Sequence, residues 1–208
     1  MTDDRPHRPP LVRYLMPVAA GFLATVAVAL LVVFGRSTGG GSGGGATADE
    51  PAAAPVVSAA SASCARGPSR DSRGTPTSYE PAHAVDGDPA TAWRCDGDGA
   101  GQHITLELAG PARVTRIGLV PGLAKTDPGD GTDRYAQNRR IAQVRVSTDA
   151  GDVEAGLETD AGDRVVQYVD VGATTRSVTL TILRSVPGSE QNGQAAIDSV
   201  AISEIVVS

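Results

Sequence analysis

Apolar and polar residues alternate in several short stretches of the larger, C-terminal part of the chain. Apolar side chains take every second position in residues 104–108, 144–146 and 178–182, and polar side chains lie between them. A period of two places one face of a strand in a core and the other in solvent. Stretches rich in Gly, Pro, Asp and Asn, such as 121–133 and 185–194, predict the intervening turns and loops. The pattern therefore predicts an antiparallel β-sandwich.

A different pattern occupies the N-terminal part. Residues 14–34 form an apolar run without any charged residue, long enough to cross a bilayer as a helix. Three arginines precede the run and only Arg36 follows it closely. The positive-inside rule then predicts that residues 1–13 are a cytoplasmic tail and that the rest is an extracellular part on a cell membrane. The alternative is a cleaved signal peptide, which the length of the run and the lack of a nearby small-residue cleavage site disfavour.

Between the apolar run and the strands lies a segment of low complexity. Residues 35–62 are rich in Gly and Ser and then in Ala and Pro, so they bury too little apolar surface to offset the entropy of ordering. We expect a flexible linker with a root-mean-square span on the order of 30 Å. Residues 63–208 are long enough to form a single core, and we expect them to be the extracellular domain.

Charge and residue inventory exclude two classes of function. The formal net charge is -6, and no run is dense in Lys or Arg, which argues against a nucleic-acid partner. The predicted domain has two histidines, His83 and His103, no G-x-S-x-G motif and no zinc-ligand spacing. No pair of carboxylates is singled out by spacing for glycoside hydrolysis. We therefore expect a protein that is not an enzyme.

Several segments resemble one known family. Residues 78–93, SYEPAHAVDGDPATAW, resemble the opening signature of discoidin, or coagulation factor (F5/8) type C, domains. Residues 103–108 and 113–122 are similar to the strands that follow in that family. Residues 135–151 and 185–207 resemble a bacterial branch known as NADase-type glycan-binding domains. The resemblance implies a jelly-roll β-sandwich, similar to galactose-binding domains, that binds a ligand and performs no hydrolysis.

The turn at residues 84–91 combines short oxygen-bearing side chains with a glycine, a composition that can wrap a hard cation. The resemblance implies a structural calcium ion here. Its implied ligands are the backbone oxygens of Ala84 and Asp88, the Asp86 carboxylate, the Thr91 hydroxyl and Glu204 from the last strand. The alternative is that Asp86 and Thr91 only form hydrogen bonds within the turn.

Aromatic residues make up 3% of the chain, and Trp93 is the only tryptophan. Stacking on aromatic rings is a common way of binding sugar faces, so their scarcity counts against a strong aromatic platform. The resemblance implies that Trp93 packs in the core beneath the calcium turn rather than stacking on a ligand.

A loop before the strand at 144–146 carries the candidate ligand-binding residues. Ligand sites on such sandwiches usually lie among loops, where polar groups bind hydroxyls or carboxylates. The candidates are Asp133, Arg134, Tyr135, Asn138 and Arg139. The alternative is that Asn138 caps a turn and that the arginines are solvated or ion-paired.

Cys64 and Cys95 are the only cysteines, and both lie in the predicted extracellular part, where oxidation is permitted. We expect a disulfide between them, which closes a loop of about thirty residues, rather than two reduced thiols.

Two functions remain open. The resemblance favours a membrane-tethered, non-catalytic module that binds carbohydrate, either a glycan or a cell-wall polysaccharide. The alternative is a sensing or protein-interaction ectodomain that binds a protein partner.

Overall fold

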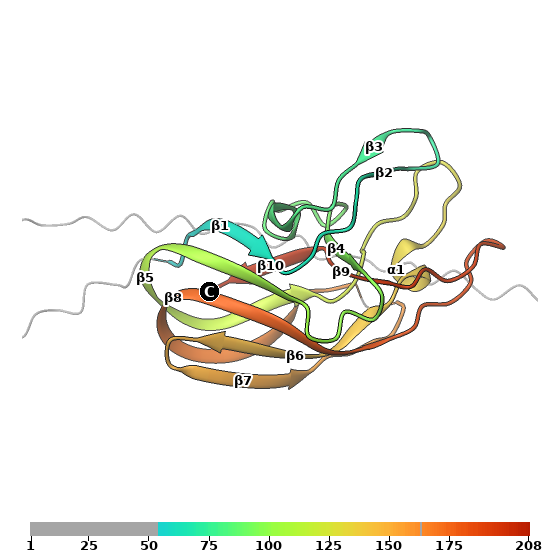
Figure 1. Cartoon of the computed structure of the whole chain (residues 1–208). Helices are drawn as coiled ribbons and strands as arrows, with labels where there is room; N and C mark the ends of the chain where they lie inside the picture. The colour runs from blue at the N-terminus through green and yellow to red at the C-terminus, as the bar shows by residue number, and fades with distance from the viewer. Residues whose placement is uncertain (1–53, 163) are drawn as a thin grey trace, which may run out of the picture. The chain divides into compact units, whose positions relative to one another are not determined.

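The computed structural model of the chain describes residues 54–162 and 164–208 (Figure 1). The predicted cytoplasmic tail, the predicted transmembrane helix at 14–34 and most of the predicted linker lie outside these residues. Within the described ranges, no helix is long and apolar enough to cross a membrane.

The described residues form strands with two short helices between them. The strands are β1 (Val57–Ala62), β2 (Ser69–Arg70), β3 (Pro76–Thr77), β4 (Trp93–Asp96), β5 (His103–Val120), β6 (Arg140–Thr148), β7 (Gly151–Gly156), β8 (Gln167–Val186), β9 (Ser199–Ile202) and β10 (Glu204–Val207). The helices are the 3₁₀ turn η1 (Pro81–Ala84) and α1 (Arg134–Gln137).

Two long strands, β5 and β8, build both layers of a β-sandwich. They pair antiparallel in two stretches: residues 103–107 with 177–181, and residues 112–119 with 167–175, with a register shift between the two. Figure 1 shows both strands bending over between these stretches, which brings the two halves face to face. Strands β1, β6 and β7 extend the first half in the order β1-β5-β8-β6-β7, and β10 pairs with the second half of β5. The predicted all-β sandwich is confirmed.

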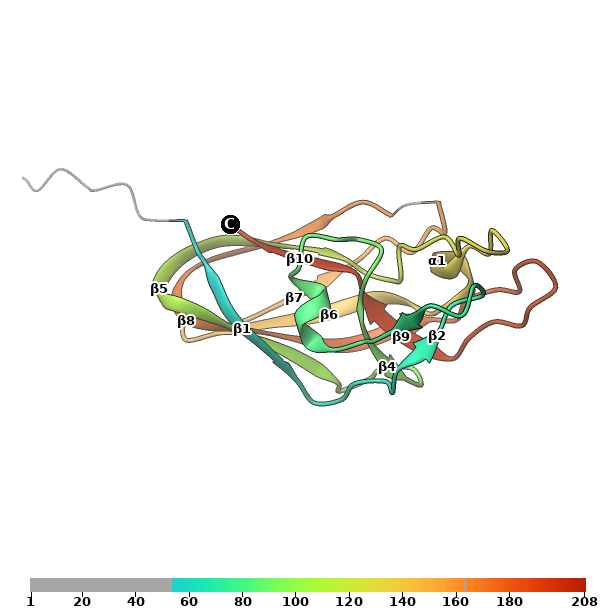
Figure 2. The same cartoon turned by 90° about the horizontal axis from the view of Figure 1, so that it is seen from above.

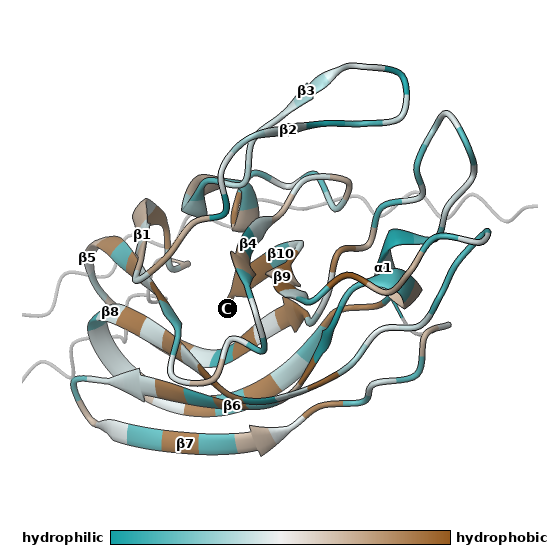
Figure 3. Cartoon of the chain, turned by 45° about the vertical axis from the view of Figure 1, so that its right-hand side comes forward, coloured by the Kyte–Doolittle hydropathy of each residue, from teal (hydrophilic) through white to brown (hydrophobic). Residues whose placement is uncertain are grey.

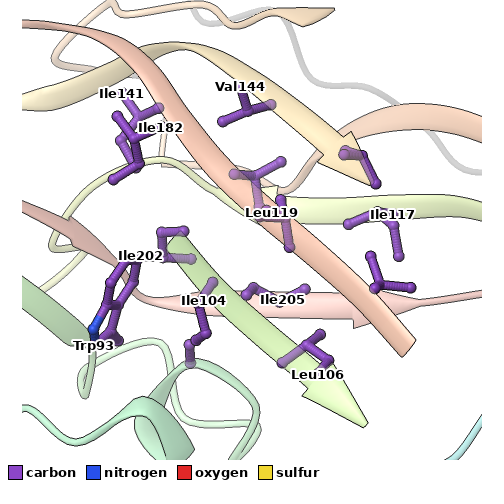
Figure 4. Packing of buried hydrophobic residues seen from close by; sticks show 14 of the residues in the cluster. Trp93, Ile104, Leu106, Ile117, Leu119, Ile141, Val144, Ile182, Ile202 and Ile205 are labelled. Carbon is purple, nitrogen blue, oxygen red and sulfur yellow. The ribbon is translucent and has the colours of Figure 1, made fainter. Parts of the chain in front are cut away.

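The core lies between the two layers and follows the predicted alternation. Ile104 and Leu106 from the first half of β5 and Ile117 and Leu119 from the second half are fully buried. Figure 4 shows these side chains converging with Ile205 of β10 in one cluster. Hydrophobic and hydrophilic residues alternate along β6 and β8 in Figure 3. The period of two thus identifies which face of each strand is inside.

Strand β1 corrects the predicted linker. Residues 57–62 were expected to belong to a flexible segment ending at 62, but they pair with residues 104–108 of β5. Val57, Ala60 and Ala62 are partly buried against the core. The low-complexity composition is misleading here because an open sheet edge supplies backbone hydrogen bonds to any extended segment of small residues. The folded domain therefore begins before residue 63.

A two-stranded ribbon, β4 with β9, covers one side of the core. Its residues Trp93 and Cys95 are buried, and the Trp93 indole N–H donates to the backbone oxygen of Cys64 at 2.7 Å. Core packing of Trp93 is thereby confirmed. Cys64 and Cys95 form the predicted disulfide, with Cα atoms 5.8 Å apart.

Candidate ligand-binding site

A pocket lies among the loops that include the β2–β3 hairpin and the segment before α1. Figures 1 and 2 show the hairpin and α1 at the end of the sandwich opposite the bend of β5 and β8. The volume of the pocket is about 160 Å³. The walls come from the β2–β3 hairpin, the start of β4 and the loop that precedes α1. Five basic residues contribute to the lining, and we call it the arginine pocket: Arg66, Arg70, Arg94, Lys125 and Arg134.

Arg94 is the buried member of this group. Its neighbours in β4, Trp93 and Cys95, point into the core, so strand alternation places Arg94 on the other face. Loops cover that face, and Arg94 is only 4% exposed. Its Nη2 donates to Asn138 Oδ1 and, at 2.6 Å, to Ser199 Oγ. Burial lowers the pKa of the Arg94 guanidinium, which nevertheless stays charged because arginine is not deprotonated in proteins.

Tyr79 forms the wall against Arg94. The guanidinium carbon of Arg94 lies 4.6 Å from the centre of the Tyr79 ring, which is a cation–π arrangement. The Tyr79 hydroxyl lies 2.8 Å from Ser69 Oγ on β2. These contacts hold the hairpin, the segment before η1 and β4 together around the pocket.

Two carboxylates, Asp71 and Asp127, also line the arginine pocket. Asp127 forms an ion pair with Arg134 at 2.6 Å and accepts hydrogen bonds from Ser72 and the Gly129 N–H. Burial raises the pKa of Asp127, but hydrogen bonds from Ser72, Arg134 and Gly129 together lower it well below its usual range. Asp127 therefore stays ionised at neutral pH, and Arg134 matches its charge.

The second lining carboxylate, Asp71, serves the turn of the hairpin. It accepts hydrogen bonds from the backbone N–H groups of Arg73 and Thr75, at 3.0 and 2.8 Å. An Asp that binds backbone N–H groups two and four residues onward closes a turn. Asp71 is thus occupied by the backbone of its own loop.

The five candidate ligand-binding residues differ in burial: two are fully buried and three are partly exposed. Tyr135 and Asn138 are fully buried, so the structure does not place either side chain on the surface where a ligand would meet it. Asn138 accepts from Arg94 and donates to the backbone oxygen of Arg134, and the Tyr135 ring packs against Gly122. Asn138 is buried because it satisfies Arg94 and the backbone of α1, and Tyr135 is buried because its ring fills the space beside Gly122.

The other three candidates remain partly exposed, and only Arg134 lines the arginine pocket. Asp133 caps α1 by accepting from the N–H groups of Tyr135 and Ala136, and it pairs with Arg164. Arg139 pairs with Asp198. Arg134 and Arg139 are therefore ion-paired, which is the alternative that the sequence left open for the arginines of this segment.

The turn at residues 84–91, which we call the cation turn, contains the hydrogen bonds that we expected if Asp86 and Thr91 bind only within the turn. Thr91 Oγ1 lies 2.8 Å from Asp86 Oδ2 and 2.9 Å from the backbone oxygen of Asp88. The Asp88 N–H donates to Asp86 Oδ1 at 3.0 Å, and His83 Nδ1 lies 3.0 Å from Asp86 Oδ2. Asp86, Asp88 and Thr91 thus lie close together, joined by hydrogen bonds within the turn.

Glu204, the first residue of β10, is the neighbour of this turn whose surroundings fit a bound cation. Its Oε2 is buried and has no hydrogen-bond partner among the described residues. Burial raises the pKa of Glu204, and the negative charge of Asp86 raises it further. A buried carboxylate beside a second carboxylate is stabilised when a hard cation lies between them. No group of three or more His, Cys, Asp or Glu residues in the described ranges is arranged as a metal site, so this set depends on hydroxyl and carbonyl oxygens.

The sandwich with its loop-end pocket is the architecture of an F5/8 type C domain. The family model described as "NAD glycohydrolase translocation F5/8 type C domain" matches residues 57–208. The chain belongs to this family, as the resemblance of its motifs predicted. The description names a translocation domain and assigns no glycohydrolase activity to it.

Solved structures with similar folds include carbohydrate-binding modules. The CBM32 of AlyQ in complex with 4,5-unsaturated mannuronic acid has 16% identity and a TM-score of 0.48, covering 74% of this chain and 95% of that one. The family 32 CBM of Clostridium perfringens NanJ in complex with galactose has 19% identity and a TM-score of 0.44, covering 72% and 91%. CBM32-3 from a family 31 glycoside hydrolase of Clostridium perfringens has 18% identity and a TM-score of 0.46, covering 71% and 89%. No curated protein matches the chain.

Proposed function

We propose that this chain is a non-catalytic carbohydrate-binding module, held on the outer surface of a cell membrane by residues 14–34. The observation that carries the proposal is the arginine pocket. Its guanidinium, hydroxyl and carboxylate groups surround a space of about 160 Å³ at the loop end of the sandwich. Polar groups that converge on a small concave site are typical of binding sites for small polar units such as a sugar residue. The resemblance to glycan-binding domains supports the same assignment.

A chain of hydrogen bonds before and within the turn at residues 84–91 resembles a hydrolase triad. Ser78 Oγ lies 2.6 Å from His83 Nε2, and His83 Nδ1 lies 3.0 Å from Asp86. This is the order of groups in a Ser-His-Asp site. However, Asp86 is shared with Thr91, and Ser78 does not line the arginine pocket. We assign these contacts to fixing the turn, and we expect a fluorophosphonate probe to leave Ser78 unlabelled.

We propose further that a calcium ion stiffens the turn beside the pocket. Asp86 and Glu204 would supply carboxylate oxygens, Thr91 a hydroxyl oxygen, and Ala84 and Asp88 backbone oxygens. The partnerless Oε2 of Glu204 supports this set. The ion would be structural, since it would hold the segment between η1 and β4 in place. Thr91 belongs both to this turn and to the lining of the pocket.

A binding experiment tests the module. The full-length chain, purified in a non-ionic detergent, is applied to an array of plant, microbial and animal glycans and to insoluble cell-wall polysaccharide. We expect retention on at least one polysaccharide. The test variant is Lys125→Gln, which changes the pocket lining and should weaken retention, and the matched control is Arg113→Gln at an exposed position of β5. Absence of binding to every glycan, with capture of a purified protein partner instead, would favour the protein-interaction alternative and reject the module.

A further inference from the structure

The buried Arg94 forms no ion pair within residues 54–162 and 164–208, and Asp96 acts on its charge only from beyond ion-pair distance. No carboxylate of the described residues lies within ion-pair distance of it, and Nη2 is bound only to the neutral oxygens of Asn138 and Ser199. Its Nε is buried without a hydrogen-bond partner. A buried charge without a direct ion-pair partner is costly, and proteins normally pair it. The Tyr79 ring offsets only part of that cost.

Lys125 brings a second unmatched charge to the same pocket. Its side chain lines the arginine pocket, and its ammonium group forms neither a hydrogen bond nor an ion pair within residues 54–162 and 164–208. Arg70, a third cation, donates to the backbone oxygen of Gly74 and has no carboxylate partner among those residues.

The two carboxylates of the lining do not cancel these charges. Asp127 is matched by Arg134, and Asp71 is bound by backbone N–H groups of its turn. The pocket therefore carries excess positive charge, although the whole chain has a formal net charge of -6. A localised cationic pocket attracts an anion even where the net charge of the protein is negative.

We propose that the arginine pocket binds the anionic group of an acidic glycan, with Arg94 and Lys125 as its charged contacts. The proposal rests on the proposed carbohydrate-binding function and specifies its ligand class. Carboxylates of uronic acids and phosphodiesters of wall polymers share the required chemistry, an anionic oxygen group that accepts charge-assisted hydrogen bonds. Arg94 lies over the Tyr79 ring and donates to Asn138 and Ser199, so its guanidinium is preorganised and loses little entropy on binding.

The first test compares matched polymers on the full-length chain by isothermal titration at constant salt. The probes are polygalacturonate, carboxyl-reduced polygalacturonate and polyglycerol phosphate. We expect at least one anionic polymer to bind about tenfold more tightly than the neutral one, and Lys125→Gln and Arg94→Lys to lose about tenfold for that polymer. The control Arg113→Gln removes an exposed charge from β5 and should leave the affinity unchanged. Melting curves show whether Arg94→Lys is folded.

The second test needs no substitution in the protein. Lys125 is the only lysine, so an acetylating reagent modifies this side chain and the N-terminal amine alone. The bound anionic polymer should slow acetylation of Lys125 about tenfold and leave the N-terminal amine unaffected. Peptide mass spectrometry reads both positions in one sample.

The outcomes separate this inference from the proposed function. A preference for polygalacturonate over polyglycerol phosphate, or the reverse, identifies the source of the anion, and either supports the inference. Equal binding of acidic and neutral polymers, or full acetylation of Lys125 in the presence of the ligand, overturns the inference while the carbohydrate-binding function stands. Absence of binding to any polysaccharide overturns both.

Discussion

The guanidinium of Arg94 lies 4.6 Å above the ring of Tyr79, and both side chains are almost completely buried. Tyr79 precedes η1, whereas Arg94 belongs to β4, so the contact joins two segments on either side of the cation turn. Ser69 of the β2–β3 hairpin extends the contact through the Tyr79 hydroxyl. This arrangement makes the arginine pocket a preformed feature of the domain.

The disulfide fastens the start of the domain to this region. Cys64→Ser combined with Cys95→Ser should lower the free energy of unfolding by about 3 to 4 kcal/mol, because the bridge closes a loop across a sequence separation of 31 residues. Urea unfolding, followed by Trp93 fluorescence, measures the change. Reductant should destabilise the wild type by a similar amount and leave the double variant unaffected. An unchanged midpoint in the double variant would contradict the prediction.

The proposed calcium ion gives a second prediction. Chelator should lower the melting temperature of the wild type, and calcium at about 100 times its dissociation constant should restore about 2.7 kcal/mol of stability. Glu204→Gln should abolish this response. It should not destabilise the calcium-free protein, because the neutral amide removes repulsion from Asp86. The control Glu154→Gln, on exposed β7, should respond to calcium like the wild type. A melt that is indifferent to chelator would rule out the ion.

Acid should weaken the ion pair on the pocket wall. Hydrogen bonds from Ser72, Arg134 and Gly129 lower the pKa of Asp127 below its usual 3.8, although burial opposes the shift. A lowered pKa contributes stability that is present above the unfolded-state value and is lost as the pH falls through the folded-state value. Asp127→Asn should therefore cost about 2 kcal/mol at pH 7, with a deficit that shrinks below pH 3.8.

Denaturant unfolding between pH 2 and pH 7 checks this dependence. The control is Asp170→Asn, at an exposed position of β8, which should match the wild type throughout. A deficit of Asp127→Asn that is the same at every pH would show that the variant acts through packing rather than charge.

The loop before α1 depends on a close contact between Gly122 and Tyr135. A Cβ atom at position 122 would lie 2.5 Å from Tyr135 Cε2, and the buried ring has little freedom to move. Gly122→Ala should therefore lower stability by about 1 to 3 kcal/mol. Gly110→Ala is the control, because a Cβ there meets nothing within 4 Å. Thermal melts of the two variants compare them directly, and equal melting temperatures would refute the importance of the contact.

The sequence by itself determined the strands and their inner faces. Alternation along β5, β6 and β8 is a local property of an extended backbone, so residues such as Ile104 and Leu180 could be assigned to a core without knowing their partners. The disulfide was predictable because the chain has only two cysteines. Trp93 in the core followed from the resemblance of its motif to a known family.

Composition was a poorer guide than alternation at the domain boundary. The Ala- and Ser-rich residues 57–62 have little tendency to order alone, yet β5 supplies them with an edge to pair with. Local composition measures what a segment can bury by itself, and a strand at a sheet edge depends on its neighbour.

Only the tertiary structure decided which polar residues form the pocket. Alternation places Arg94 on the outward face of β4, where an arginine is normally solvated, and it does not reveal that Tyr79 and Asn138 cover that face. Conversely, the sequence around Tyr135 and Asn138 suggests an exposed loop, but Tyr135 lies in α1, Asn138 ends this helix, and both are buried. The burial of an outward-facing side chain is set by loops distant in sequence, and no local period encodes where those loops lie.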